Sequence, residues 1–164
     1  YDVQELKRIN VKYTIVGHSD KRKKYSETNE EINKKIKELL NNNICPILCI
    51  GEEKEEDDIE ECLKQQLVTA LLGIKTTSIM IAYEPVWAIA SGKIPSKNQL
   101  LKALEYISEI AIELLGVKPI LLYGGSVNEK TISYLEEIKL LEGYLIGSTS
   151  LDIDRLNSVI EVVE

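Results

Sequence analysis

The sequence has no excess of basic charge, no long apolar stretch and no recognisable leader. It holds 20 lysines and arginines against 27 acidic residues, which gives a net charge of −7. It therefore offers no basic stripe to a nucleic acid. No apolar run approaches the ~20 residues that a membrane-spanning helix needs, and no signal-peptide pattern opens the chain. These absences predict a cytoplasmic protein with neither a nucleic-acid nor a membrane partner.

Cysteine and histidine are scarce as well. Cys45, Cys49 and Cys62 cannot all form pairs, and no CxxC spacing occurs. We expect them to be reduced and buried, as in a cytosolic protein. A metal site would need further ligands, and His18 is the sole histidine. We therefore predict no metal ion. The acidic cluster 52–61 is most simply a solvated loop and helix start.

The length of 164 residues suffices for one domain with a core of its own. No linker or shift in composition divides the chain, so residues 1–164 are expected to form a single domain. Residues 1–10 begin with tyrosine rather than methionine, and their pattern suggests an amphipathic helix that is already under way.

Short apolar, β-branched runs alternate with helical patterns along the chain. The expected strands are residues 13–17, 46–51, 78–83, 119–123 and 143–147. The expected helices are residues 27–42, 59–72, 96–115, 128–138 and 152–163, and residues 85–95 should form a loop. This alternation predicts an α/β protein of five βα units, preceded by one helix, around a parallel sheet buried on both faces.

The residues that could carry chemistry follow the ends of these strands, where such folds place their active sites. Glu84 could be a general base with a raised pKa, or simply a capping or ion-pairing residue. His18 could be catalytic or an ordinary satisfied histidine. Gly124-Gly125-Ser126 and Gly147-Ser148 could present N–H groups to a phosphate, although Gly-Gly alone is a turn signal.

Five blocks together resemble one family. They are GHSDKR (17–22), CIGE (49–52), AYEPVWAIASGK (82–93), YGGSV (123–127) and GYLIGSTSL (143–151). In order and in spacing they are similar to the signature blocks of the triosephosphate isomerases, which form a (β/α)₈ TIM barrel. The resemblance spans essentially the whole chain and matches strands four to eight of that barrel.

The resemblance implies interconversion of dihydroxyacetone phosphate and glyceraldehyde 3-phosphate, with no cofactor. Glu84 would be the base, and a neutral His18 would polarise the carbonyl, as is established for this family. The phosphate would be held by backbone N–H groups around Ala90, Ser126, Gly147 and Ser148. The lid would be residues 85–95, beginning with Pro85, Val86 and Trp87, and Trp87, Glu52 and Tyr123 would anchor it. Without the resemblance, Trp87 would be interpreted as a core residue.

Several positions depart from the family pattern. Asp20 and Lys21 replace the usual glutamate and arginine, so a rim hydrogen bond could be lost. Ala90 and Ser148 stand where glycine is usual, which would cost about 1–2 kcal/mol if either needed a positive φ. Pro95 has no N–H to offer to Tyr123 as a lid latch.

A full barrel needs roughly 250 residues, so five of eight units form an incomplete barrel. The family's catalytic asparagine and lysine lie on its first strand, which has no match here, and its third unit supplies the loop that joins the usual homodimer. We expect the chain alone to be marginal or aggregation-prone and very weakly active. One alternative is a non-catalytic phosphate-binding half-barrel that assembles with another polypeptide. Another is a different phosphate-binding barrel enzyme.

Overall fold

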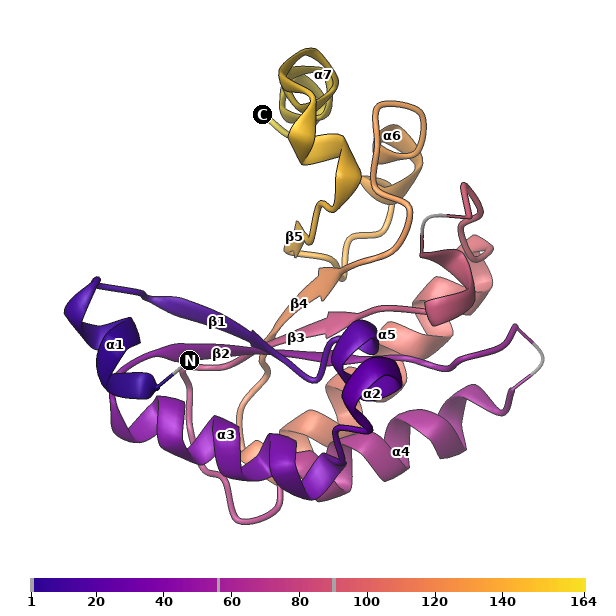
Figure 1. The fold of residues 1–164 in the computed structure, drawn as a ribbon. Coiled ribbons are helices and arrows are strands. Elements are labelled where there is room, and N and C mark those ends of the chain that lie inside the picture. The colour runs from indigo at the N-terminus through magenta and orange to yellow at the C-terminus, as the bar shows by residue number, and fades with distance from the viewer. Residues whose placement is uncertain (1, 56, 90) are drawn as a thin grey trace.

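Five short strands form one parallel sheet in the order in which they occur along the chain (Figure 1). The computed structural model describes residues 2–55, 57–89 and 91–164. The strands are β1 (Tyr13–Val16), β2 (Cys45–Ile50), β3 (Met80–Tyr83), β4 (Ile120–Tyr123) and β5 (Gly143–Tyr144). All five had been predicted, although β5 is shorter than expected. In the register of the sheet, Ile50 pairs with Tyr83, and Tyr83 pairs with Tyr123. The strands β2, β3 and β4 therefore end together at one rim.

Helices connect the strands at nearly all the expected places. They are α1 (Val3–Arg8), α2 (Ser19–Tyr25), α3 (Asn29–Asn41), α4 (Ile59–Ala70), α5 (Lys97–Leu115), α6 (Ile132–Leu135) and α7 (Ile153–Val163). The pattern did not reveal α2 or the 3₁₀ turns η1 (Val86–Ala88) and η2 (Ser148–Leu151). Two expectations were wrong in extent. Helix α6 keeps only four residues, and α1 begins at Val3, because the side chain of Asp2 caps it by accepting from Gln4 N–H.

Capping residues explain where the longest helix begins and ends. Ser96 accepts from the N–H of Gln99 while the Gln99 side chain accepts from the N–H of Ser96, which is a reciprocal capping box. At the other end Gly116 has φ +83°, a left-handed conformation that glycine adopts without a Cβ penalty. These two residues bound the helix that the sequence predicts at residues 96–115. Ser96 fixes the start of α5 directly after the loop of residues 85–95, and Gly116 fixes its end.

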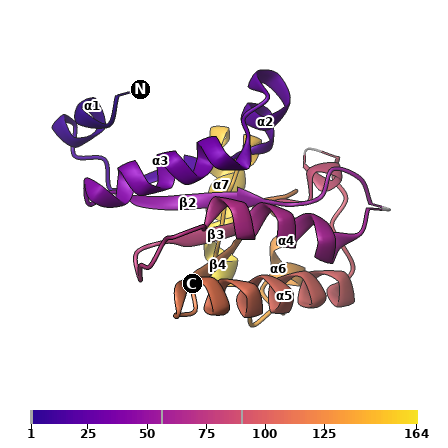
Figure 2. The same cartoon turned by 90° about the horizontal axis from the view of Figure 1, so that it is seen from below.

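Helices α3, α4 and α5 lie side by side on one face of the sheet, as both overall views show (Figures 1 and 2). The main core fills the space between these helices and the sheet. Its fully buried members include Ile36, Leu48, Leu63, Leu67, Ile81, Leu100 and Leu104. Burial of this apolar surface is the main force that holds the layers together.

The opposite face of the sheet is only partly covered. There Cys49, Ala82 and Leu122 form a second, small buried cluster. Tyr13 and Ile15 of β1, in contrast, are 57% and 49% exposed. The expectation of a sheet buried on both faces is therefore wrong at β1. Among the described residues, β1 and β5 each pair with a single neighbour, so the sheet is open at both edges.

The cysteines are free, but only Cys49 is buried, whereas Cys45 and Cys62 are partly exposed. The expectation that all three are buried is thus wrong for two of them. Within the described ranges, no helix is both long enough and apolar enough to cross a membrane.

The layered core generates a first prediction. Leu104 of α5 is fully buried, whereas Leu72 is 64% exposed. We expect Leu104→Ala to lower the free energy of unfolding by about 2–5 kcal/mol, because it leaves a cavity in a packed interface. Leu72→Ala is the matched control and should change it by less than about 0.5 kcal/mol. Urea unfolding followed by far-UV circular dichroism measures both, and equal effects of the two substitutions would contradict this assignment of the core.

Candidate active site

Glu84 follows β3 directly and is held in place by the backbone of its two neighbouring strands. Its N–H donates to the carbonyl of Ile50 at 2.7 Å. A Cβ at Gly51 would lie 2.0 Å from the carbonyl oxygen of Glu84, and one at Gly124 would lie 2.8 Å from its Cγ. Only glycine fits at these two positions, so the glycines on both sides allow the close approach that fixes Glu84.

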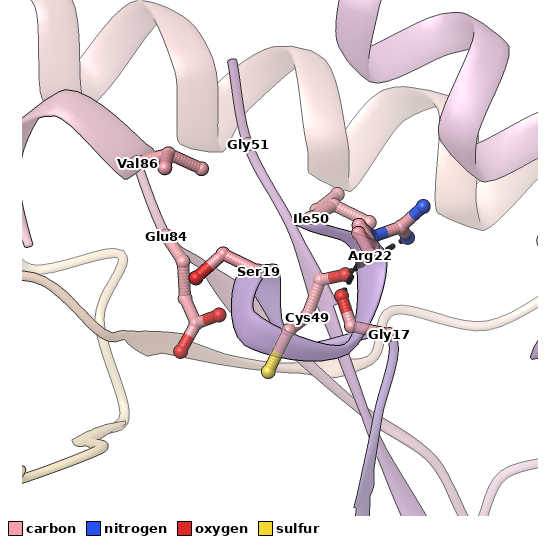
Figure 3. A pocket seen from close by; sticks show the side chains of 8 residues that line it. All are labelled: Gly17, Ser19, Arg22, Cys49, Ile50, Gly51, Glu84 and Val86. Atoms are coloured by element: carbon pink, nitrogen blue, oxygen red, sulfur yellow. Dashed lines mark hydrogen bonds between the residues drawn. The ribbon is translucent and has the colours of Figure 1, made fainter. Parts of the chain in front are cut away.

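The carboxyl group of Glu84 is buried. Its side chain is 5% exposed, and among the described residues its Oε2 has no hydrogen-bond partner. Burial raises the pKa of Glu84, and the nearby His18 and Arg22 oppose that shift. Figure 3 shows the carboxyl group beside Ser19 and Cys49, in a cavity of only about 10 Å³. That cavity is no larger than a single water site, so a substrate would have to approach Glu84 from outside it.

His18 is the N-cap of α2 and faces Glu84. Its Nδ1 accepts from the N–H of Asp20 at 3.2 Å, and its Nε2 lies 3.6 Å from Oε1 of Glu84. Because Nδ1 is an acceptor in this geometry, the hydrogen of the neutral ring sits on Nε2. The structure thus brings together the two side chains that the sequence singled out, with Nε2 of the imidazole beside the carboxyl group. The side chain of Asp20 points to Lys24, at 3.6 Å.

Arg22 ties the rim ends of β1 and β2 together, a role that sequence reasoning missed. Its Nε donates to the carbonyl of Gly17 at 2.6 Å, and Nη2 donates to the carbonyl of Cys49 at 3.3 Å. Nη1 donates to Oδ1 of Asn29 at 2.6 Å. Burial lowers the pKa of Arg22. The sequence feature that could have indicated this role is the basic end of the GHSDKR block, where Arg22 lies one helical turn after His18.

Glu52 is the second buried acid of the site and is only 1% exposed. Its carboxyl oxygens accept from the hydroxyl of Tyr83 at 3.0 and 3.1 Å and from Nε1 of Trp87 at 2.7 Å. Its backbone carbonyl accepts from the N–H of Val86 at 2.9 Å. The interpretation of residues 52–61 as a solvated cluster is therefore wrong for Glu52. The partner Tyr83 was also missed, because strand patterning suggests only that it is buried.

The segment after Glu84 contains the η1 turn and is held over the rim by a serine. Ser126 follows β4, and its Oγ donates to the carbonyl of Ala88 at 2.6 Å and accepts from the N–H of Gly92 at 3.2 Å. The side chain of Ser126 is thus a lid contact, whereas the sequence had suggested only its N–H group as a phosphate donor. Pro85, at the start of the segment, is buried.

The end of this segment is held by a residue that the sequence did not suggest. The hydroxyl of Tyr134, on α6, donates to the carbonyl of Pro95 at 3.2 Å. The hydroxyl of Tyr123 is buried and has no hydrogen-bond partner among the described residues. It lies against Gly125, where a Cβ would come within 2.2 Å of it. The structure therefore joins the lid end to Tyr134 and does not join it to Tyr123.

A pocket of about 330 Å³ lies between this segment and the loops after β4 and β5. Gly92, Ser126, Gly147 and Ser148 are among the residues that line it. The N–H groups of Ser126 and Gly147 donate to no other described residue, and Ser148 begins η2, where a helical N–H lacks an internal partner. Ser148 is absent from the residues with positive φ, so it avoids the expected strain. Ala90, also expected here, lies outside the described residues.

No group of three or more histidine, cysteine or acidic side chains in the described part of the chain is arranged to hold a metal ion. The site is built from the buried carboxyl groups of Glu84 and Glu52, the imidazole of His18 and a pocket lined by backbone donors. Such a set can move a proton at carbon beside an anionic group.

Comparison with known proteins assigns the family. A sequence model described as triosephosphate isomerase matches residues 2–163. The chain belongs to the triosephosphate isomerase family. Curated triosephosphate isomerases include one from Mycoplasmoides gallisepticum, 43% identical over 96% of this chain and 67% of its own length. Those from Mycoplasmopsis pulmonis and Dehalococcoides mccartyi are 38% and 39% identical, over 92% and 90% of this chain. This triosephosphate isomerase-family chain spans about 60% of these last two relatives.

The two tyrosines near the lid give a paired prediction for this family member. Tyr134→Phe removes a hydrogen bond and should lower the free energy of unfolding by about 1 kcal/mol. It should also speed tryptic cleavage after Lys93, an exposed lid residue. Tyr123→Phe removes a buried hydroxyl that has no hydrogen-bond partner in the described part of the chain, so it should be neutral or stabilising. Urea unfolding and timed proteolysis measure both effects, and the reverse order would show that Tyr123 is the latch.

Burial of Glu84 gives a pH-dependent prediction. Because its folded-state pKa is raised, the protonated form favours folding below the unfolded pKa of about 4.3, and this stabilisation is lost as pH rises through the folded pKa. Glutamine does not titrate. Glu84→Gln should therefore gain stability relative to the parent chain between about pH 4 and pH 7.

Urea unfolding at several pH values between these limits measures this difference. The exposed Glu53→Gln is the control and should show no comparable trend. A gain for Glu84→Gln that shrinks as pH rises would contradict the direction of the shift.

Proposed function

We propose that this chain carries the catalytic base of a triose-phosphate isomerase, which interconverts dihydroxyacetone phosphate and glyceraldehyde 3-phosphate. The observation that carries the proposal is the pairing of a buried Glu84 with Nε2 of His18 at 3.6 Å. Both lie on a rim that also bears a covering segment and a pocket lined by backbone donors. Membership of the family supports the same reaction and removes the alternative of an unrelated phosphate-binding barrel enzyme.

In the proposed reaction the ionised carboxylate of Glu84 takes a proton from the carbon next to the carbonyl. The electron pair of that C–H bond forms the enediolate, and Glu84 returns the proton to the neighbouring carbon. A raised pKa suits this role, because a carboxylate that binds its proton more tightly is a stronger base. His18 donates from Nε2 to the carbonyl oxygen and moves the hydroxyl proton between the two oxygens of the enediolate, while its Nδ1 stays fixed by Asp20 N–H.

The lid and the pocket complete the proposal. The phosphate would lie against the N–H groups of Ser126, Gly147 and Ser148, with Ala90 contributing from the lid. Residues 85–95 would exclude water from the enediolate and so limit loss of phosphate. Trp87, held by Glu52, would fix the start of the lid while the rest moves.

The chain spans about 60–67% of the curated relatives it matches, so we propose that it acts with the remainder of the barrel. By resemblance, that remainder carries an asparagine and a lysine whose charge offsets the phosphate and the developing oxyanion. The 164-residue chain alone should be nearly inactive. The exposed Tyr13 and Ile15 favour the same view, and they also fit the alternative of a non-catalytic half-barrel that assembles with another polypeptide. A cytoplasmic location and a homodimer are part of the proposal.

A complementation assay tests the base. The chain is assayed for isomerase activity alone and after refolding with the first three βα units of the Mycoplasmoides gallisepticum relative. We expect activity only in the mixture. Glu84→Asp should lower it by roughly 10²–10⁴-fold, because a misplaced base loses most of its contribution. Glu53→Asp is the control and should leave it unchanged.

Strong turnover by the chain alone would contradict the incomplete-site proposal. A stable complex without activity would favour the non-catalytic alternative. An active mixture in which Glu84→Asp keeps full activity would refute the role of Glu84.

A further inference from the structure

A positively charged side chain lines the pocket between the lid and the loops after β4 and β5. It belongs to Arg155, in the first turn of α7. In the described part of the chain, Arg155 is the one charged residue that lines this pocket. The other residues that line it are uncharged and include Ser126, Gly147 and Ser148. The pocket that backbone donors make suitable for an anion therefore also has one cation at its wall.

Helix stability does not explain this arginine. The first turn of a helix favours negative charge, since its free N–H groups form the positive end of the macrodipole. Asp152 already satisfies that end, because its Oδ1 accepts from the N–H groups of Asp154 and Arg155 at 3.1 Å each. A cation in this turn is electrostatically unfavourable unless another negative group compensates for it.

An ion pair with Glu129 is present but gives only weak stabilisation. Arg155 Nε lies 3.1 Å from Oε2 of Glu129, and the two side chains are 44% and 30% exposed. Pairs of this kind contribute between ~0 and 1 kcal/mol. Nη1 and Nη2 of Arg155 donate to no other described residue. Glu129 thus fixes one edge of the guanidinium, and the two terminal donors stay free for a ligand.

We propose that Arg155 is a phosphate-binding side chain of this pocket. Its terminal N–H groups would donate to phosphate oxygens, while Ser126, Gly147 and Ser148 donate from the backbone. A planar guanidinium matches two oxygens of a tetrahedral anion at once and keeps its charge at any physiological pH. This inference rests on the proposed function in one respect, which is that the anion belongs to a triose phosphate.

Direct titration of the whole 164-residue chain with inorganic phosphate tests this role without any need for catalysis. Binding is followed by amide chemical shifts of Gly147 and Ser148. We expect Arg155→Gln to weaken phosphate binding by roughly tenfold or more, as for loss of a charge-assisted hydrogen bond. Arg155→Lys should retain part of the affinity. Lys130→Gln is the matched control, because it removes the same charge from an exposed neighbour that does not line the pocket.

The variant Glu129→Gln distinguishes phosphate binding by Arg155 from a purely structural role of its ion pair with Glu129. If Arg155 binds phosphate, this variant should bind phosphate at least as tightly as the parent chain, since it removes a nearby negative charge. Urea unfolding of each variant shows that the fold is kept.

The inference is overturned by equal phosphate affinity of Arg155→Gln and the parent chain, by an equal loss in Lys130→Gln, or by no phosphate binding to the parent chain. Isomerase activity is measured separately. Arg155-dependent phosphate binding, together with no isomerase activity in the mixture with the first three βα units, would therefore refute the proposed reaction and leave this inference standing.

Discussion

The hydrogen bonds of the buried Glu52 are the interaction on which the geometry of the site depends. Its carboxyl group holds Tyr83, the residue before Glu84, and also Trp87, while its carbonyl holds the N–H of Val86. Glu84 is therefore fixed from both sides along the chain. A buried carboxyl group is costly unless it is hydrogen-bonded, and the Tyr83 hydroxyl and Trp87 Nε1 offset that cost. The same partners leave Glu84 little freedom to move away from the rim.

The close packing of backbone around Glu84 has the same effect across the sheet. Gly51 and Gly124 bring the neighbouring strands so near that any side chain there would collide with Glu84. The position of the Glu84 side chain is thus determined by glycines and hydrogen bonds at the ends of three adjacent strands. Among the described residues the carboxyl oxygen Oε2 of Glu84 has no hydrogen-bond partner, which is a destabilising arrangement of the kind that is concentrated at functional sites.

The sequence predicted what depends on periodicity and on local caps, and missed what depends on tertiary contacts. All five strands, the long helices and the stop at Gly116 follow from apolar spacing and from capping residues, which are local properties. His18 and Glu84 could be placed together because parallel strands end at one rim. Tyr134 and Arg155 could not, since their contacts come from α6 and α7, whose packing the pattern does not specify. The interpretation of the acidic cluster 52–61 as solvated was wrong at Glu52 for a similar reason, because burial of Glu52 depends on its contacts with Tyr83 and Trp87.

The lid shows how a departure in one residue is accommodated elsewhere. Pro95 cannot donate a hydrogen bond, but its carbonyl still accepts, and Tyr134 reaches it from α6. The first part of the lid is held by Glu52, its middle by Ser126 and its end by Tyr134. Only the first of these contacts lies beside Glu84. Loss of the Ser126 and Tyr134 contacts would therefore leave the hydrogen bond between Glu52 and Trp87 intact. Glu52 and Ser126 are the buried contacts among these, and each holds a different part of the segment after Glu84, so the Glu52 contacts that fix Tyr83 and Trp87 do not depend on Tyr134.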